Sequence, residues 1–255
     1  MTTPIHSHSK FTYFASDFHL GVPNFEKSLQ RERLLVKWLD EIKDKAESIY
    51  FLGDIFDFWF EYKYVVPKGY VRLLGKLAEL SDAGIKLVIF IGNHDMWIKD
   101  YLEKEIGATI IRGPIQTTIG NHKFYLAHGD GIGPGDYGYK FIKQIFKNPI
   151  CQWLFSRLHP NFAFGLANFF SKLSRNAHQE TDKKFLGNDK EWLVTYSNEI
   201  QRKQHFDFYV YGHRHLPLEI PLSAGATYIN LGDWLSYNSY GVYDGNCFRL
   251  NYYKG

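Results

Sequence analysis

The first half of the chain alternates short apolar runs with longer segments whose apolar residues recur at helical spacing. Three short runs are predicted to be strands: Phe11–Ser16, Ser48–Gly53 and Ile85–Ile91, the last of them fully buried. Between them, Glu26–Lys45 and Lys68–Ala83 have the apolar spacing of amphipathic helices. Gly84 follows the second helix, where a glycine commonly ends one. This β-α-β-α-β order predicts parallel strands with helical crossovers.

The second half of the chain has a stronger β character. Ile115–Ile119 and Lys123–Ala127 flank Gly120 and Asn121, which predicts a β-hairpin. From Phe206 onward, short β-prone runs are separated by Gly, Pro and Asn. They predict a second, mostly β half of the same α/β domain, so we expect residues 1–255 to form a single domain.

The segment Tyr137–Arg175 differs in composition from the rest of the chain. Its 39 residues include six Lys and Arg, ten aromatic rings and no Asp or Glu. The pattern predicts amphipathic helices broken at Pro149 and Pro160. The chain has a formal net charge of +3, so this segment at +6 leaves the remainder at −3. A basic, aromatic helical surface is typical of an element resting on anionic headgroups. The alternative is an ordinary helical subdomain that packs its rings inward.

The composition excludes several classes of protein. With 255 residues, 45% hydrophobic and 22% charged, the chain is neither disordered nor a small disulfide scaffold. Cys151 and Cys247 lie far apart, which favours a reducing compartment. The N-terminus lacks the apolar segment of a signal peptide, and no apolar run approaches the roughly 20 residues of a membrane-spanning helix. We expect a cytoplasmic protein, at most peripheral on the inner membrane, without a nucleic-acid partner.

Five short motifs rich in Asp, His and Gly each follow a predicted strand. They are Asp17–His19, Gly53–Asp57, Gly92–Asp95, His128–Asp130 and Gly212–His215. In open α/β sheets, ligands bind beyond the carboxyl ends of the strands. Carboxylates, imidazoles and an amide oxygen suit Mn²⁺, Fe²⁺ or Zn²⁺. Each motif alone could be a turn, a helix cap or a surface loop, but five in order predict a metal site. Seven potential ligands fit two ions that share a carboxylate better than one ion with an open position.

The ordered set DxH, GDxxD, GNHD, HGD and GHxH resembles the calcineurin-like metallophosphoesterase superfamily and spans residues 17–215. The resemblance implies a four-layer αββα sandwich with a helical cap insert at about 137–186. It also implies two divalent ions, with Mn²⁺ expected and Fe²⁺ or Zn²⁺ as alternatives. The implied ligands are Asp17, His19 and His215 for one ion, Asn93, His128 and His213 for the other, and Asp54 between them.

The resemblance also assigns catalytic roles. In the superfamily, the histidine of GNHD assists at the leaving group, and the second aspartate of GDxxD orients it. These residues are His94 and Asp57 in this chain. General acid assistance of this kind is worth roughly 10²–10⁴-fold in rate.

Within the superfamily, the chain is similar to the UDP-2,3-diacylglucosamine pyrophosphohydrolases of lipid A synthesis. The stretches FASDFHLG, GDIFDFW and HGDGIGPGDYGYKFIK carry this similarity. It implies a nucleotide-linked glycolipid as substrate, hydrolysed to UMP and 2,3-diacylglucosamine 1-phosphate. Asp136 and Tyr139 fall where that family contacts its substrate, and Arg175 and Lys183 lie in the polar stretch that would hold its later substrate residues. Enterobacterial members carry Arg where this chain has His94, which predicts a divergent branch.

Two other functions fit the same motifs. The protein could be a soluble phosphodiesterase or nucleotidase acting on nucleotides, with the aromatic insert stacking on bases. It could also be a non-catalytic binding module that keeps the fold. A phosphoprotein phosphatase is disfavoured, because that branch has Arg directly after the second aspartate of its GD motif, where this chain has Phe58.

Overall fold

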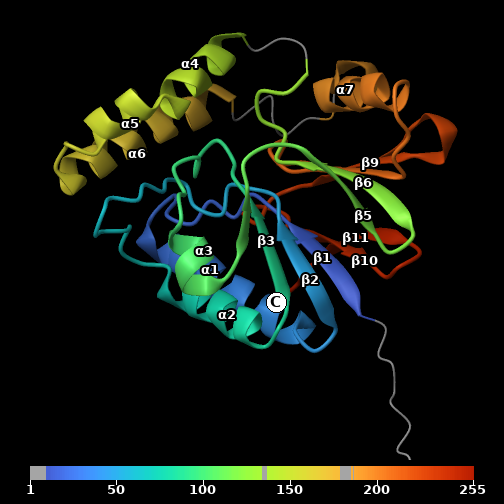
Figure 1. Cartoon of the computed structure of the whole chain (residues 1–255), viewed down its shortest axis with the longest axis horizontal. Coiled ribbons are helices and arrows are strands. Elements are labelled where there is room, and N and C mark those ends of the chain that lie inside the picture. The colour runs from blue at the N-terminus through green and yellow to red at the C-terminus, as the bar shows by residue number, and fades with distance from the viewer. Residues whose placement is uncertain (1–9, 134–136, 179–184, 186) are drawn as a thin grey trace, which may run out of the picture.

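The computed structural model describes residues 10–133, 137–178, 185 and 187–255. This part of the chain forms two β-sheets packed face to face, with helices on their outer faces (Figure 1). The first sheet has the strand order β11-β10-β1-β2-β3-β4, and the second has the order β5-β6-β7-β9-β8. The mixed α/β class expected from the sequence is confirmed.

The strands are β1 Phe11–Ala15, β2 Ala46–Phe51, β3 Lys86–Phe90, β4 Thr109–Ile111, β5 Ile115–Ile119, β6 His122–Ala127, β7 Phe208–Tyr211, β8 Pro217–Pro221, β9 Thr227–Leu231, β10 Ser239–Tyr243 and β11 Phe248–Tyr252. The helices are α1 Phe25–Ile42, α2 Val71–Asp82, α3 Tyr101–Ile106, α4 Tyr137–Lys147, α5 Pro149–Phe155, α6 Pro160–His178 and α7 Trp192–Gln201. Short 3-10 turns cover Asn188–Lys190 and Ser223–Gly225.

Three hydrophobic cores fill the spaces between four layers. One lies between the first sheet and helices α1, α2 and α3, and it includes Trp38 and Leu77. The second lies between the two sheets and includes Phe14 and Phe124. The third lies between the second sheet and α7, around Leu193. The layer order is therefore helix, sheet, sheet, helix, as the resemblance implied.

The alternation of side chains along the central strands explains why most of their residues are apolar. In β1, Tyr13 and Ala15 point into the helix-covered core, whereas Phe14 points between the sheets. In β6, Tyr125 faces α7 and Leu126 faces the other sheet. Successive side chains of a strand point to opposite faces, so a strand covered on both sides needs apolar residues at every position.

Local sequence signals explain several of the observed element ends. The N-cap residue of α1 is Asn24, whose side chain accepts a hydrogen bond from the N–H of Lys27. Gly84 follows α2 in the left-handed region, with φ of 84°. Pro149 and Pro160 each begin a new helix, α5 and α6, where a proline loses no intrahelical hydrogen bond. The expected breaks in the aromatic segment are confirmed.

The C-terminal strands are divided between the two sheets. From Phe206 onward we expected a second, mostly β half, and this part of the chain forms strands β7 to β11, of which β10 and β11 return to the first sheet. Strand β10 pairs antiparallel with β1, with Phe14 opposite Gly241. Pairing with β10 removes the exposed edge that β1 would otherwise present. Helices α3 and α7 were not anticipated either.

Helices α4, α5 and α6 lie outside the four layers, along one side of the molecule (Figure 1). They correspond to the basic, aromatic segment of the sequence. Among the helices that the structure describes, none has the length and apolar character needed to cross a membrane.

Candidate metal centre

The first ligand group lies at the ends of β1 and β7. The Nε2 atoms of His19 and His215 are 3.2 Å apart, and Asp17 Oδ1 lies 3.7 Å and 3.4 Å from them. Asp17 and His19 are buried, whereas the His215 side chain is 24% exposed. Two imidazole nitrogens and a carboxylate oxygen that converge in this way could bind one divalent cation.

The second ligand group lies beside the first. Asp54, His128 and His213 come together from the ends of β2, β6 and β7. The amide oxygen of Asn93, which follows β3, lies 3.1 Å from Nε2 of His128. The His128 and His213 rings are 5.1 Å apart between centroids. All seven ligands predicted from the motifs therefore lie in one cluster, although their roles as ligands stay predictions.

Asp54 lies between the two groups. Its Oδ2 is 3.6 Å from Nε2 of His19 and 3.4 Å from Nε2 of His128. Its Oδ1 accepts a hydrogen bond from the backbone N–H of His94 at 2.9 Å. One carboxylate oxygen is thus held by the protein, while the other faces both groups of nitrogens, as the shared ligand of two ions would.

The buried polar atoms of this cluster fit a cation site. Asp17 Oδ1 and Asp54 Oδ2 are buried and have no hydrogen-bond partner among the described residues. Burying a carboxylate oxygen without a partner is costly, and a bound cation would remove that cost. The donor set of carboxylates, imidazoles and an amide oxygen is also one that divalent transition metals accept.

Two histidines are oriented through their far nitrogens. Nδ1 of His128 donates a 2.6 Å hydrogen bond to the carbonyl of Leu52, and Nδ1 of His215 lies 3.3 Å from Oδ2 of Asp233. A proton on Nδ1 leaves the lone pair on Nε2, which is the atom turned toward the cluster. Carbonyl and carboxylate partners of this kind fix metal-binding histidines in many proteins.

The backbone at this cluster is strained. Five of the seven predicted ligands have positive φ values, between 43° and 66°: Asp17, His19, Asp54, His213 and His215. The left-handed region is unfavourable for residues other than glycine and costs about 1–3 kcal/mol each. Such strain persists only where the surrounding structure imposes it, and it concentrates at functional sites.

Two glycines let the loops approach closely. A Cβ on Gly92 would lie 2.1 Å from Oδ1 of Asp54, and one on Gly212 would lie 2.6 Å from Oδ2 of Asp17. Any side chain at either position would displace a predicted ligand. The glycines of the GNHD and GHxH motifs are therefore required for the ligand loops to meet.

The buried carboxylates of the cluster favour positive charge beside them, as the pKa values of the neighbouring groups show. Burial alone would raise the pKa of Asp17, but His215 and His19 lower it to about 2. Burial alone would lower the pKa of His128, but Asp54 raises it to about 10. The pKa of His213 falls to about 4 because of burial and the neighbouring His128. The buried carboxylates thus attract positive charge, which protons on imidazoles or metal ions could supply.

The predicted catalytic pair lies at the edge of the cluster. The His94 ring packs edge-on against His19 at 4.7 Å between centroids, and its Nδ1 donates a 3.0 Å hydrogen bond to the backbone carbonyl of Asp57. The Asp57 carboxylate is 3.6 Å from the same nitrogen. Burial lowers the pKa of His94 below its usual value. The structure therefore brings Asp57 and His94 together.

Sequence reasoning missed two carboxylates that support the ligand loops. Asp233, which follows β9, contacts His215 and accepts hydrogen bonds from the N–H groups of Ser236 and Tyr237. Its signal was available, since it follows a glycine after a strand as Asp54 does. Asp95 accepts hydrogen bonds from the N–H groups of Gly92 and Ile55, which ties the GNHD loop to the GDxxD loop.

A buried ion pair supports the loop that carries His213 and His215. Arg214 lies between them and pairs with Glu191, the N-cap residue of α7, through Nε and Nη2, each 3.0 Å from a carboxylate oxygen. Both side chains are buried. No sequence signal marked this pair, because the two residues are distant along the chain.

The predicted substrate residues are only partly described. The Tyr139 hydroxyl donates a 2.5 Å hydrogen bond to Asp130 Oδ2, and Lys143 pairs with the same carboxylate. This links α4 to the HGD loop. Arg175 belongs to α6. Asp136 and Lys183 lie outside the described residues.

Aromatic residues hold the outlying helices against the site. Phe155 of α5 packs against Trp97 and Phe60, at 4.7 Å and 4.9 Å between ring centroids. Phe164 of α6 packs edge-on against Phe58 at 5.0 Å. Phe58 and Phe60 lie within three residues of the end of the GDxxD motif, and Trp97 lies two residues after the GNHD motif. Helices α5 and α6 therefore lie beside the metal cluster.

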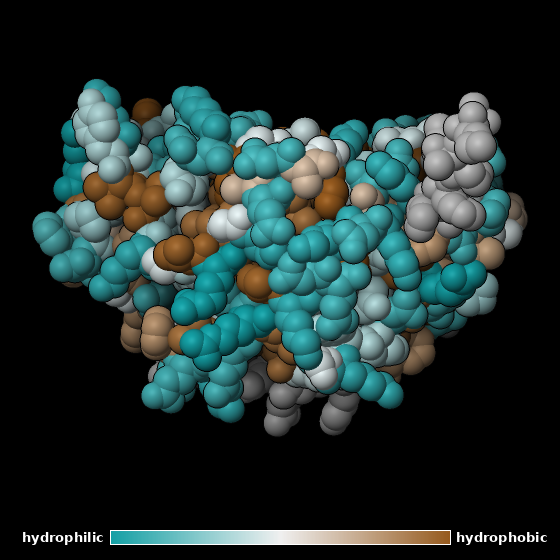
Figure 2. Space-filling view, turned by 90° about the horizontal axis from the view of Figure 1, so that it is seen from below, coloured by the Kyte–Doolittle hydropathy of each residue, from teal (hydrophilic) through white to brown (hydrophobic). Residues whose placement is uncertain are grey.

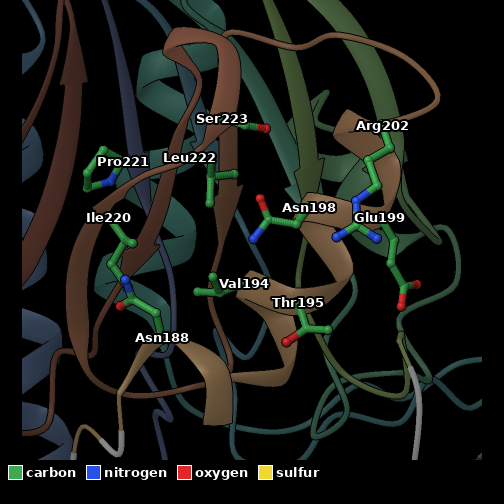
Figure 3. Close-up of a pocket in the computed structure, with 10 residues that line it drawn as sticks. All are labelled: Asn188, Val194, Thr195, Asn198, Glu199, Arg202, Ile220, Pro221, Leu222 and Ser223. Atoms are coloured by element: carbon green, nitrogen blue, oxygen red, sulfur yellow. The ribbon is translucent and has the colours of Figure 1, made fainter.

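A separate surface pocket lies between α7 and the end of β8 (Figure 3). Its lining residues are Asn188, Val194, Thr195, Asn198, Glu199, Arg202, Ile220, Pro221, Leu222 and Ser223. No predicted site residue is among these. The pocket is therefore distinct from the metal cluster.

Comparison with known proteins agrees with the motif set. The profile of the Calcineurin-like phosphoesterase family matches residues 12–217. A UDP-2,3-diacylglucosamine hydrolase of Porphyromonas gingivalis is 41% identical over 252 residues, which cover 93% of this chain and 95% of that protein. Proteins of the same name from Pseudomonas fluorescens and Edwardsiella ictaluri are 32% and 26% identical, covering 86% and 81% of this chain and 86% and 76% of their own lengths. The prediction of a metal-dependent hydrolase is confirmed.

Proposed function

Since the chain belongs to the calcineurin-like phosphoesterase family, we propose that it hydrolyses the pyrophosphate of UDP-2,3-diacylglucosamine, yielding UMP and 2,3-diacylglucosamine 1-phosphate. Relatives that carry the name of this hydrolase match most of the chain. The observation that carries the proposal is the position of Asp54, whose buried Oδ2 lies between the nitrogens of two ligand groups.

The cluster would hold two divalent ions. Asp17, His19 and His215 would bind one and Asn93, His128 and His213 the other, with Asp54 shared. We propose Mn²⁺, with Fe²⁺ or Zn²⁺ as alternatives that the same donors accept. Bound ions of this kind supply a water of lowered pKa and positive charge for the phosphoryl oxygens. The protein holds the ligand loops in place. Its strained backbone and the carboxylates of Asp95 and Asp233 orient the donor atoms before any substrate arrives.

His94 would act at the leaving group, and Asp57 would orient its ring. The contact between His94 Nδ1 and the Asp57 carbonyl puts the proton on Nδ1 when the ring is neutral. Nε2 is then the atom available to the substrate. Only the protonated ring carries a proton on Nε2 that could pass to the leaving oxygen, and burial makes that ring a stronger acid because it lowers the pKa of His94.

Helices α4–α6 would form a cap over the site within a single phosphoesterase domain. Their rings divide into two sets. Phe155 and Phe164 pack against rings of the loops that follow β2 and β3. Phe141, Trp153 and Phe169 are instead 68%, 55% and 63% exposed. Exposed rings on an acid-free, basic element suit acyl chains and anionic headgroups. The face of the molecule seen in Figure 2 is, by contrast, mainly hydrophilic, with separate hydrophobic groups.

The proposed cap also suggests a cellular location for the protein. We propose that it acts in the cytoplasm, with the cap resting on the inner membrane. Sedimentation with vesicles of anionic lipid tests this part separately. Replacing Phe141 and Trp153 by Ser should weaken sedimentation and leave metal content unchanged, and equal sedimentation of both proteins would exclude the cap as the contact.

A substrate comparison tests the activity itself. The Mn²⁺-loaded protein is assayed with UDP-2,3-diacylglucosamine, bis-p-nitrophenyl phosphate and cyclic nucleotides. We expect release of UMP from the lipid at a kcat/KM far above that for the other esters. Turnover of the generic esters or nucleotides with the lipid untouched would favour a soluble phosphodiesterase or nucleotidase. No turnover of any ester would favour a binding module.

A further inference from the structure

One hydroxyl of helix α6 reaches the predicted catalytic pair. Ser171 donates a 2.9 Å hydrogen bond from Oγ to Oδ2 of Asp57, and the same Oγ lies 3.2 Å from Nδ1 of His94. Ser171 and Asp57 are 114 positions apart in the sequence. A residue of the outlying helices thus contacts both members of the pair.

The Asp57 carboxylate, which accepts the hydrogen bond from Ser171, also lies close to two imidazole rings. Its Oδ1 lies 3.4 Å from Nδ1 of His19 and 3.6 Å from Nδ1 of His94. The carboxylate is almost fully buried, at 3% exposure. A carboxylate can rotate about its Cβ–Cγ bond, and a hydrogen bond to the second oxygen restricts that rotation. The Ser171 hydroxyl therefore helps to hold Oδ1 in its place relative to both rings.

The same face of α6 makes an apolar contact with the same loop. Phe164 packs against Phe58, the residue that follows Asp57. Phe164 and Ser171 are seven positions apart, which is two helical turns, so they lie on one side of the helix. Phe169 and Phe170 of the same helix are 63% and 56% exposed. One side of α6 thus contacts the catalytic loop, while other positions present rings to the outside.

We propose that Ser171 is a positioning residue, which orients His94 through the Asp57 carboxylate when α6 is seated against the loop. This rests on the proposed role of His94 in phosphoester hydrolysis. Because a hydroxyl on the cap helix completes the arrangement around His94, the cap takes part in turnover as well as in binding.

Kinetics of Ser171→Ala test the proposal. We expect kcat to fall by about tenfold with KM changed by less than about twofold, because orientation of a general acid is lost and substrate contacts remain. Metal content should stay equal to that of the parent protein. Ser171→Thr keeps a hydroxyl on the same side of the helix and should recover most of kcat. Ser156→Ala is the matched control, since the Ser156 hydroxyl donates its hydrogen bond within its own helix end, to the Trp153 carbonyl.

A double-mutant cycle identifies the route of the effect. If Ser171 acts through His94, Ser171→Ala should lower kcat by less than about twofold in a His94→Ala background. The same tenfold loss in both backgrounds would overturn the proposal, as would an unchanged kcat, a change confined to KM, or loss of metal. Each measurement is made with UDP-2,3-diacylglucosamine and with bis-p-nitrophenyl phosphate. A parent protein that leaves the lipid untouched contradicts the proposed substrate, while the cycle on the diester still tests Ser171.

Discussion

The Asp17 carboxylate accepts a 2.9 Å hydrogen bond from the backbone N–H of His213, across 196 positions of sequence. Asp17 follows β1 in the first sheet, and His213 follows β7 in the second. This bond joins the two sheets at the metal cluster. It also leaves the other carboxylate oxygen, Oδ1, as the one directed at His19 and His215. The fold itself therefore orients a predicted ligand, and several measurable consequences follow.

Metal should stabilise the folded protein. Asp17 Oδ1 and Asp54 Oδ2 are buried without hydrogen-bond partners among the described residues, so a cation that binds them stabilises the folded state only. Free Mn²⁺ at 100 times its Kd would contribute about 2.7 kcal/mol, or a rise in Tm of about 5–10 °C for a chain of this size. Thermal unfolding with Mn²⁺ and with a chelator measures the difference. Equal Tm values would argue against a metal site here.

Asp54→Ala should abolish metal-dependent hydrolysis. Both proposed ions lose their shared ligand, and several kcal/mol of transition-state stabilisation is lost, so we expect kcat to fall by about 10³-fold or more. The assay is hydrolysis of bis-p-nitrophenyl phosphate at saturating Mn²⁺, with metal per protein measured in parallel. Asp44→Ala, at an exposed position, is the control. Activity retained at saturating Mn²⁺ would refute a shared ligand at position 54.

His94→Ala should separate turnover from metal binding. His94 lies at the edge of the cluster and is not among its predicted ligands, so metal content should stay close to that of the parent protein. We expect kcat for the lipid to fall by roughly 10²-fold, within the range of general acid assistance. If metal content declines in proportion to activity, then His94 supports the metal site instead.

Gly92→Ala should disrupt the site, whereas Gly75→Ala should not. A Cβ on Gly92 would meet Asp54 Oδ1 at 2.1 Å, which forces the carboxylate to move and costs about 1–3 kcal/mol. Gly75 lies inside α2, and a Cβ there meets nothing within 4 Å, so alanine should stabilise the helix by about 0.5–1 kcal/mol. Denaturant unfolding and hydrolysis rates compare the two variants. Full activity in Gly92→Ala would contradict the close approach of the two loops.

Glu191→Ala should destabilise the loop that carries His213 and His215. The substitution leaves the buried Arg214 guanidinium without its carboxylate, and breaking a buried pair in this way costs about 3–5 kcal/mol. We expect a lower Tm together with weaker Mn²⁺ binding. Glu199→Ala on the exposed side of the same helix is the matched control. Unchanged metal affinity in a folded Glu191→Ala protein would show that the pair does not support the ligand loop.

The sequence by itself predicted most of the local elements and the chemical character of the site. The mostly apolar run Ile85–Ile91 predicted a strand covered on both faces, because such a strand presents few side chains to water. Pro149 and Pro160 marked helix starts, since proline constrains its own backbone wherever it stands. The motif residues predicted a metal cluster, because Asp, His and Asn after parallel strands meet at one end of a sheet.

Tertiary structure decided which distant residues meet. The return of β10 and β11 to the first sheet, the pair of Arg214 with Glu191, and the contact of Ser171 with Asp57 join segments far apart in the chain. Periodicity describes only neighbours a few positions apart, so it predicts which face of an element is apolar but not which element covers it. The motifs, through their resemblance to a known superfamily, were enough to name the proposed ligands. The residues that orient them emerged only once the two sheets and the outlying helices were packed together.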